Sequence, residues 1–229
     1  MNHRILVVED DLDLAEITKL NLEHAGYDVS LAHSYQDALA LLQDDSFDLI
    51  LLDILLPDEN GDALCRKIRD NCVCPIIFMS CLDDSGTIIS ALKDGGDDYV
   101  VKPVNYGELL ARIQANIRRV QCYHPNASRR KGLREFKQFS IDTIHHKVLQ
   151  NGSEVVLSPI EYALLEYMTA HPDTLLLYND LYHQIWKNDS LGDIRTVMVH
   201  ISNLRKKIDL NKTGLIETVR GAGYIFSDI

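Results

Sequence analysis

Apolar residues in the first half of the chain come in short continuous runs, and each run ends in a charged or hydroxyl residue. The clearest run is Leu-Ile-Leu-Leu at 49–52, which leads into Asp53 before Pro57 breaks the pattern. An apolar run of this length bounded by turn signals indicates a parallel strand that is covered on both faces. Residues 4–8, 75–79 and 98–101 predict similar strands, and residues 27–31 predict a second, alternating strand.

Helical patterns separate these strands. Apolar positions spaced for one helix face follow Asp10, Ser34, Asp62, Asp84 and Tyr106, and glycines stop the first and fourth helices. Strands that alternate with helices predict a parallel sheet with right-handed crossovers. We therefore expect an α/β domain with a flavodoxin-like, five-stranded parallel sheet in the order 2-1-3-4-5.

The second half of the chain has a different pattern. Short β-like pieces are expected at 133–139, 147–150 and 154–157, with an Asn-Gly turn at 151–152. Ser158, Pro159 and Glu161 form the signature of a capped helix start. Further helices are expected at 178–186 and 194–209, and residues 216–226 predict a hairpin with a glycine turn. Three helices and a terminal hairpin predict an α+β winged-helix domain.

Length and composition agree with two globular domains. We expect one domain at 1–121, a linker at 122–132, which lacks an apolar period, and a second domain at 133–229. No run of eighteen apolar residues occurs, so a membrane span is not expected, and a signal peptide and a membrane partner are not expected either. The five cysteines are odd in number, and Cys72-Val73-Cys74 lacks a second ligand pair for zinc, which favours reduced thiols and a cytoplasmic protein.

The net charge of −11 is unevenly distributed. Residues 1–121 contain 10 Lys and Arg against 22 Asp and Glu, whereas residues 122–229 contain 13 against 12. The segment 195–220 contains six basic and two acidic residues. An acidic half joined to a locally basic half predicts different partners for each, although a solvated helix face would give the same local excess.

Chemically active side chains follow four strands of the predicted sheet. The first strand ends in Glu9 and Asp10, the third in Asp53, the fourth in Ser80 and the fifth in Lys102. Ligands bind at the carboxyl ends of strands in open α/β sheets. Each residue alone could be a loop acid, a helix cap or a surface ion pair. Together at one edge they predict a site for phosphate chemistry.

This arrangement resembles the receiver domain of two-component response regulators. The strings at 195–207 and 219–224 resemble the output domain of the OmpR/PhoB class, so the resemblance covers nearly the whole chain. It implies that Asp53 accepts a phosphoryl group and that Mg²⁺ screens the repulsion between anions. Asp10, Asp53 and the backbone carbonyl of Leu55 would bind the metal directly, and Glu9 would act through water. Lys102 would neutralise one phosphoryl oxygen and Ser80 would hydrogen-bond another.

The resemblance also assigns a switch and a dimer face. Ser80 and Tyr99 would be the switch pair, the aromatic ring turning inward when Ser80 moves. Cys81 and Gly96 stand where relatives usually carry alanine. The dimer face would be built from the fourth helix, fifth strand and fifth helix. Its charged residues would be Asp97, Asp98, Glu108, Arg112, Arg118 and Arg119. Relatives form ion pairs between subunits at this face, and Ile88 replaces a usual Lys or Arg there, so Glu108 is expected to lack its partner in the second copy. A solvated charged surface is the alternative.

The third helix of the second domain is expected to enter the DNA major groove. Apolar Val197, Ile201, Leu204 and Ile208 would pack inward, while Asn203 would point outward to base edges. Arg220 at the wing tip would enter the minor groove. Relatives often carry Asp at Met198 and Arg at Asn203, so base preference should differ. The DNA-binding residues implied are Arg195, His200, Asn203, Arg205, Lys206, Lys207 and Arg220.

Two other functions are open. A haloacid-dehalogenase-like phosphohydrolase would also use Asp, Mg²⁺, Ser and Lys, but it needs a second Asp two residues after the nucleophile, where this chain has Leu55. An atypical regulator that ignores phosphorylation would usually lose an acid or the lysine, and none is lost here. We therefore expect a regulator and not an enzyme. Its partners would be a sensor histidine kinase, double-stranded promoter DNA, RNA polymerase and a second copy of the chain when phosphorylated.

Overall fold

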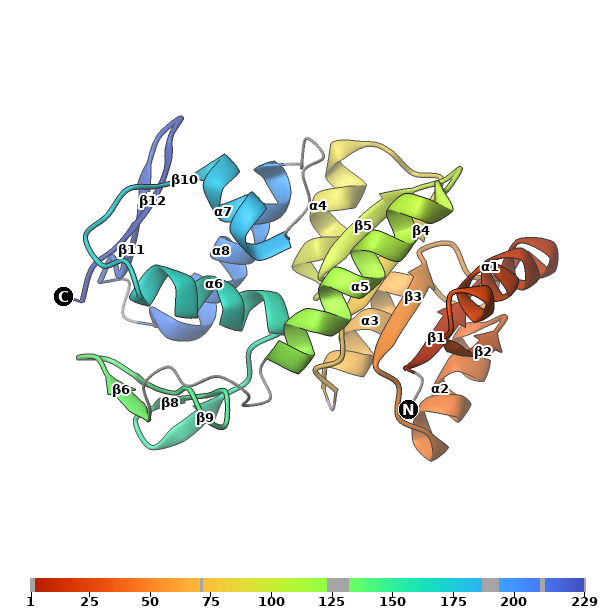
Figure 1. The fold of residues 1–229 in the computed structure, drawn as a ribbon, viewed down its shortest axis with the longest axis horizontal. Helices are drawn as coiled ribbons and strands as arrows, with labels where there is room; N and C mark the ends of the chain where they lie inside the picture. Colours follow the sequence, from red (N-terminus) through yellow and green to blue (C-terminus); the bar gives the residue numbers. More distant parts are fainter. Residues whose placement is uncertain (1–2, 71, 123–131, 187–193, 211–212, 229) are drawn as a thin grey trace. The chain divides into compact units, whose positions relative to one another are not determined.

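The computed structural model describes residues 3–70, 72–122, 132–186, 194–210 and 213–228 (Figure 1). The chain divides into two compact units, residues 1–117 and 118–229. Most of the predicted linker, 123–131, lies outside the described residues, and helix α5 extends from Tyr106 to Cys122. Within the described part of the chain, no helix combines the length and the apolar character needed to cross a membrane.

The first unit alternates strands and helices, as the sequence predicted. Its strands are β1 (Arg4–Val8), β2 (Asp28–Ala32), β3 (Leu49–Asp53), β4 (Ile76–Ser80) and β5 (Asp98–Val101). Its helices are α1 (Leu12–His24), α2 (Tyr35–Asp44), α3 (Gly61–Arg69), α4 (Ser85–Lys93) and α5. The strands are parallel and run in the order β2-β1-β3-β4-β5, which confirms the predicted topology.

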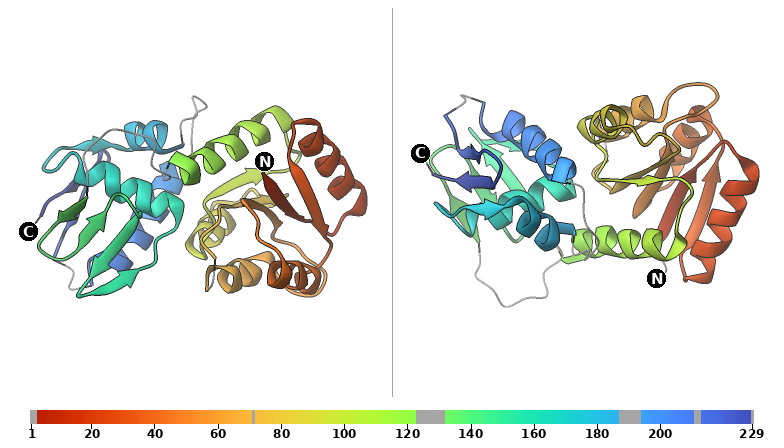
Figure 2. Two further views of the ribbon diagram at one scale, coloured as in Figure 1. Left: turned by 60° about the horizontal axis from the view of Figure 1, so that its bottom comes forward. Right: turned by 90° about the horizontal axis from the view of Figure 1, so that it is seen from above.

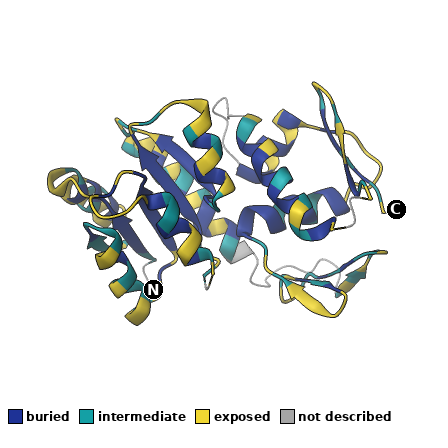
Figure 3. Ribbon diagram, turned by 180° about the vertical axis from the view of Figure 1, so that it is seen from behind, coloured by how far each residue is buried: buried dark blue, intermediate teal, exposed yellow. Residues whose placement is uncertain are grey.

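The sheet is buried on both faces, which explains the continuous apolar runs. Alternate residues such as Ile5, Leu49 and Ile77 form one core with residues of α1 and α5. The residues between them, such as Leu6 and Phe78, point to the opposite face and are equally buried. Figure 2 shows helices on both sides of this sheet, and Figure 3 shows its central strands as buried.

The described residues of the second unit form a four-stranded antiparallel sheet, three helices and a second, three-stranded sheet. The first sheet holds β6 (Leu133–Glu135), β7 (Ser140–Asp142), β8 (Lys147–Gln150) and β9 (Ser153–Val155) in that order. The helices are α6 (Pro159–Thr169), α7 (Tyr178–Trp186) and α8 (Ile194–Ile208). Strands β11 (Ile216–Val219) and β12 (Gly223–Phe226) form the predicted terminal hairpin. The predicted α+β winged-helix arrangement is confirmed.

Local signals placed α6 correctly. The Ser158 hydroxyl accepts a hydrogen bond from the backbone of Glu161, and the Glu161 carboxylate accepts one from the backbone of Ser158. This capping box satisfies two amide groups that the first helical turn cannot bond internally.

The prediction of a single β-like piece at 133–139 was wrong. The backbone N–H of Phe136 bonds to the carbonyl of Phe139, which closes a turn and starts the separate strand β7. The rings of Phe136 and Phe139 stack at 4.9 Å and both meet Phe226. Their apolar character therefore serves the core and not a strand. The two-residue strand β10 (Leu176–Leu177), which pairs with β12, was also missed because it is too short to show a period.

Candidate functional site

Three side chains from three strand ends form a buried ionic cluster in the first unit. Glu9 follows β1, Asp53 ends β3 and Lys102 follows β5, so parallel pairing delivers all three to one edge of the sheet. The Lys102 ammonium donates to both carboxylate oxygens of Glu9 at 2.9 and 2.6 Å and to Asp53 Oδ2 at 2.5 Å. Glu9 is 1% and Asp53 5% exposed. One cation therefore holds two buried carboxylates side by side.

Burial and charge act in opposite directions in this cluster. Burial raises the pKa of Glu9, and the hydrogen bonds from Lys102 oppose that rise without cancelling it. Burial lowers the pKa of Lys102, but hydrogen bonds to Asp53 and Glu9 outweigh the burial and raise it overall. The lysine therefore stays charged at neutral pH, as a group that must neutralise an incoming anion needs to.

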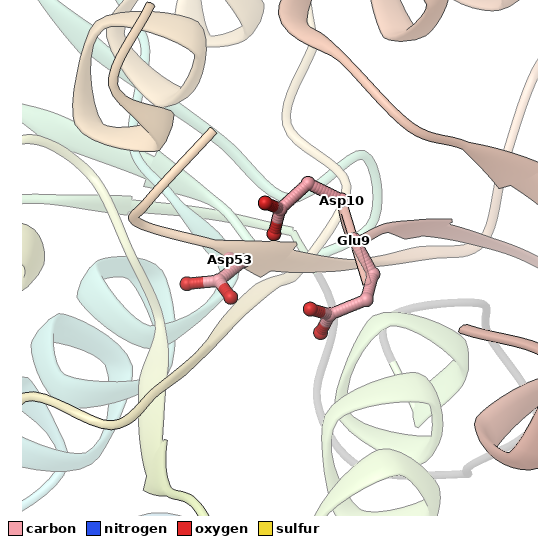
Figure 4. A group of neighbouring side chains, drawn as sticks. All are labelled: Glu9, Asp10 and Asp53. Carbon is pink, nitrogen blue, oxygen red and sulfur yellow. The ribbon is translucent and has the colours of Figure 1, made fainter. Parts of the chain in front are cut away.

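The acids fit a divalent cation. One carboxylate oxygen from each of Glu9, Asp10 and Asp53 lies within 4.8 Å of the other two, and no other group of three or more His, Cys, Asp or Glu among the described residues meets this criterion. Figure 4 shows the three carboxylates gathered where β1 and β3 end. Such an all-oxygen set with two buried acids and one exposed acid is the type that suits Mg²⁺, which retains several waters. Asp11 has another role, because it caps α1 through the backbone N–H groups of Asp13 and Leu14.

The loop after Asp53 is held tightly, and two of its residues were not predicted from the sequence. A Cβ atom on Gly61 would lie 1.9 Å from the carbonyl oxygen of Asp53, so only glycine fits this close approach. The Asp58 carboxylate accepts hydrogen bonds from the backbone of Tyr35 and Gln36. The Leu55 N–H donates to Asp53 Oδ1 at 3.0 Å and directs that oxygen. The glycine four residues after Pro57 was the available signal, but its role depends on a contact across the loop.

Ser80 and Tyr99 lie next to this cluster. Ser80 is fully buried at the end of β4, and its hydroxyl accepts a hydrogen bond from the backbone of Leu82 at 3.4 Å. Tyr99 is 9% exposed, and its hydroxyl donates to the Leu82 carbonyl at 2.6 Å. Burial raises the pKa of Tyr99, against an opposing hydrogen bond to Ser80. Both predicted switch residues therefore contact the same loop between β4 and α4.

The predicted dimer face is largely engaged within its own chain. Asp98 is buried and accepts two hydrogen bonds from Arg112, at 3.0 and 2.9 Å. Arg112 also donates to Glu108 at 3.0 and 2.8 Å, so Glu108 has a partner within its own chain. The expectation that Glu108 lacks a partner in a second copy stays a prediction. Asp97 is fully buried and bonds Arg69 at 2.6 Å. The pattern of charges along the sequence could not show that Asp97 and Asp98 are buried.

Two further expectations about this face need correction. Ile88 is 7% exposed, so it is a core residue of α4 and does not stand open as a missing surface cation. Arg119 is 8% exposed in the second unit, where its guanidinium donates to the Ile185 carbonyl at 3.3 and 2.7 Å. It also lies 6.0 Å from the ring centre of Trp186. Of the two neighbouring arginines, only Arg118 is exposed.

Some of the α8 residues that were expected to face DNA are buried in the structure. Val197, Ile201, Leu204 and Ile208 are fully buried, as predicted. His200 and Asn203 are also buried, at 2% and 8% exposure, so the expectation that Asn203 points from the exposed side was wrong in this structure. The His200 ring lies 5.6 Å from that of Trp186. The more accessible positions recur about every four residues, as one helix face requires: Arg195, Met198, Ser202 and Lys206.

The remaining basic residues divide into two kinds. Arg205 bonds the Ile216 carbonyl and the Thr218 hydroxyl of β11, and its guanidinium lies 5.2 Å from the Tyr224 ring centre. Lys207 bonds Glu161 at 2.6 Å. Arg205 thus joins α8 to the β11–β12 hairpin, which is the wing, and Lys207 joins α8 to α6. Arg220, at the turn between β11 and β12, is exposed.

The chain matches models of two protein families in the same order as its two units. Residues 5–114 match the response regulator receiver domain, and residues 152–226 match the transcriptional regulatory protein C terminal domain. The response regulator ArlR of Staphylococcus saprophyticus is 37% identical over 97% of this chain and 98% of its own length. The DNA-binding response regulator MtrA of Mycolicibacterium paratuberculosis is 34% identical over 98% of both.

A solved structure shows the same likeness in three dimensions. The structural match with the response regulator DrrB of Thermotoga maritima, described as an OmpR/PhoB homolog, covers 99% of this chain and 100% of the DrrB chain. The TM-score is 0.52 at 28% sequence identity.

Proposed function

This chain belongs to the OmpR/PhoB class of two-component response regulators, a family of transcription regulators and not of enzymes, and on that premise we propose that Asp53 is its phosphoacceptor. The observation that carries the proposal is the Lys102 ammonium, which bonds both Asp53 and Glu9 at the carboxyl edge of the sheet. It places a cation beside the carboxylate that would receive a dianionic group.

The reaction needs an in-line attack by one carboxylate oxygen on phosphorus. The Leu55 N–H donates a hydrogen bond to Asp53 Oδ1, and the Lys102 ammonium donates one to Asp53 Oδ2. Lys102 would neutralise charge on the phosphoryl oxygens, and the buried Ser80 hydroxyl would donate to another oxygen. Asp10, Asp53 and the Leu55 carbonyl would hold Mg²⁺, with Glu9 acting through water. Bound there, Mg²⁺ would screen the repulsion between the attacking carboxylate and the phosphoryl oxygens.

The test is phosphorylation by acetyl phosphate in the presence of Mg²⁺. The wild-type chain should gain one phosphoryl group that is lost at alkaline pH, as an acyl phosphate is. Asp53→Asn keeps the size of the side chain and should abolish the gain, whereas Asp13→Asn, in the first turn of α1, should not. Labelling that persists in Asp53→Asn would reject the assignment. Chelation of Mg²⁺ should prevent labelling of the wild type.

The second unit supports DNA binding through α8 and the hairpin. Helix α8 would lie in the major groove, presenting Arg195, Met198 and Lys206, and Arg220 would enter the adjacent minor groove. Arg205 and Lys207 would keep the helix and wing in place, because both are bonded within the unit. Two subunits would occupy direct-repeat half-sites about 10–10.5 bp apart, one helical turn.

Phosphorylation would promote pairing of two copies through α4, β5 and α5. Asp98, Arg112 and Glu108 already form a connected ion-pair set on β5 and α5, which could exchange partners with a second copy. The exposed Arg118 adds an accessible cation. The partners would be a sensor histidine kinase, promoter DNA and RNA polymerase, and the setting would be the cytoplasm.

A further inference from the structure

Two cysteines lie at the edge of the first unit's sheet opposite to the phosphoacceptor. Cys72 and Cys74 precede β4, whose far end carries Ser80. Cys72 and Cys74 are partly exposed and Val73 between them is 51% exposed. The position is therefore open to small molecules and separate from the acid cluster.

The two cysteines are joined by a hydrogen bond. The backbone N–H of Cys74 donates to Cys72 Sγ at 3.4 Å. Arg69 binds the backbone on both sides, since its Nη1 donates to the carbonyl oxygens of Cys72 at 3.3 Å and Cys74 at 2.5 Å. Asp97 holds the same guanidinium at 2.6 Å. The chain is thus fixed in a conformation that holds the Cys72 sulfur against the Cys74 backbone, next to a residue that carries a positive charge.

This environment makes the two sulfurs unequal. The hydrogen bond from the Cys74 thiol lowers the pKa of Cys72 to about 6, helped by the Cys74 N–H and by Arg69. The same hydrogen bond and burial raise the pKa of Cys74 well above its usual value. Burial raises the pKa of Cys65, the other cysteine near Arg69, to about 12. At neutral pH a thiolate therefore lies against a thiol, which is the pairing of an attacking and a resolving cysteine.

We propose that Cys72 and Cys74 form a redox-active dithiol that is oxidised by hydroperoxides. The Cys72 thiolate attacks the terminal peroxide oxygen and the O–O bond breaks as Cys72 becomes a sulfenic acid. Hydroxide leaves from hydrogen peroxide, and alkoxide leaves from an organic hydroperoxide. Cys74 then attacks the Cys72 sulfur, its thiol proton leaves with the sulfenic oxygen as water, and a disulfide closes between the two residues. The peroxide is reduced by two electrons and the two thiols are oxidised by two.

The experiment uses the full-length chain with two substitutions. Cys81→Ser leaves Cys72 and Cys74 as the only cysteines of the tryptic peptide 70–93, and Cys122→Ser leaves Cys65 as the only other cysteine of the chain. Brief treatment with hydrogen peroxide at pH 7 should remove two hydrogen atoms from this peptide, as seen by mass spectrometry, and dithiothreitol should restore them. Cys65 should remain unmodified and serves as an internal reference. In untreated protein, alkylation of Cys72 by iodoacetamide should follow a titration with its midpoint near pH 6.

Single variants separate the two roles. Cys74→Ala should stop at the sulfenic acid, which dimedone traps, and should slow alkylation of Cys72 at pH 7 by about tenfold because the thiol donor is lost. Cys72→Ser should give neither sulfenic acid nor disulfide. The proposal is overturned if peptide 70–93 keeps its hydrogens, if Cys72 and Cys65 react at equal rates, or if the disulfide forms only between chains. Labelling of Asp53 by acetyl phosphate should persist in Cys72→Ser, so this result is independent of the phosphoacceptor.

Discussion

The hydroxyl of Tyr99 donates a hydrogen bond to the carbonyl oxygen of Leu82 at 2.6 Å, which joins the middle of β5 to the loop that follows Ser80. In the same loop, the backbone N–H of Leu82 donates a hydrogen bond to the Ser80 hydroxyl. A movement of Ser80 toward a phosphoryl group would thus disturb a segment that Tyr99 holds directly. This connection gives the proposed switch pair a physical link that side-chain identity alone does not provide.

Tyr99→Phe should loosen this loop and leave the ring in place. A neutral hydrogen bond contributes about 0.5–1.5 kcal/mol, so amide exchange at 81–85 should accelerate by roughly two- to tenfold. Hydrogen exchange of the full-length chain measures this. Tyr106→Phe is the matched control, because its hydroxyl also makes one hydrogen bond, to Thr18, on another helix. Equal exchange at 81–85 in both variants would mean that the Tyr99 hydroxyl does not restrain the loop.

The fold and the acid cluster could be predicted because both depend on short-range patterns. Apolar runs specify buried parallel strands, and the parallel order then brings Glu9, Asp53 and Lys102 to one edge regardless of loop detail. The surface predictions failed where long side chains choose partners in three dimensions. Arg119, for example, donates to the Ile185 carbonyl and is buried, and Asn203 is covered although its helical position looked open. Gly61 was missed because its role is a contact with the Asp53 carbonyl.

Gly96, which replaces a usual alanine, is explained by Phe78. A Cβ at Gly96 would lie 2.6 and 2.7 Å from two atoms of that ring. Gly96→Ala should therefore destabilise the first unit by about 1–3 kcal/mol through overpacking. Combined with Phe78→Leu, which removes ring atoms, the loss should be smaller than the sum of the two single losses. Calorimetry of the full-length variants measures this, and strictly additive losses would show that the two residues do not interact.

The exposed Arg118 should contribute to pairing of phosphorylated chains. Arg118→Glu replaces an accessible cation on α5 by an anion and should weaken the dimer. The expected loss is about 0.2–1 kcal/mol per exposed pair. A symmetric interface contains two such pairs, so the dissociation constant should rise by up to about thirtyfold. Sedimentation of the phosphorylated chain over a concentration series gives this constant. Lys67→Glu, on α3, has the same change of charge away from α5 and should leave it unchanged.

Asp209 should stabilise the second unit in a pH-dependent way. Its carboxylate accepts hydrogen bonds from the backbone of Thr213 at 2.7 Å and Gly214 at 3.1 Å, after the end of α8. Burial alone would raise the pKa of Asp209, but these hydrogen bonds lower it below the ordinary value. The pKa of Asp209 is therefore lower in the folded protein than in the unfolded chain, where it is about 3.9. The stability that this difference contributes is complete above the unfolded pKa and is lost as the pH falls through the folded pKa.

Asp209→Ala should therefore cost about 1–3 kcal/mol at pH 7, and the difference from wild type should shrink only below about pH 4. Urea unfolding is followed by the fluorescence of Trp186, the only tryptophan of the chain, which belongs to the same unit. Glu217→Ala removes an exposed carboxylate from β11 and is the control. A difference that stays constant from pH 7 to pH 3 would show that the charge of Asp209 does not matter.

The exposed face of α8 should decide how the second unit binds DNA. Met198 is 42% exposed at the centre of that face and is flanked by Arg195 and Ser202. An apolar side chain in the major groove can contact the methyl group of thymine, so Met198→Ala should reduce preference at one T·A pair of the best site. Lys206, nearer the end of the helix, would contact phosphate. Lys206→Ala should therefore weaken all sequences alike and lower the salt slope by about one.

Asn203→Ala provides the decisive comparison, because Asn203 is only 8% exposed. If α8 binds DNA with the face seen in the structure, this variant should change neither base preference nor salt slope. Binding to the best site and to scrambled DNA would be measured for all three variants across a salt series. A loss of about 1–3 kcal/mol on the best site alone for Asn203→Ala would identify a base contact. In that case the covering of Asn203 must be removed on binding, and the free and bound forms of α8 must differ in what they expose.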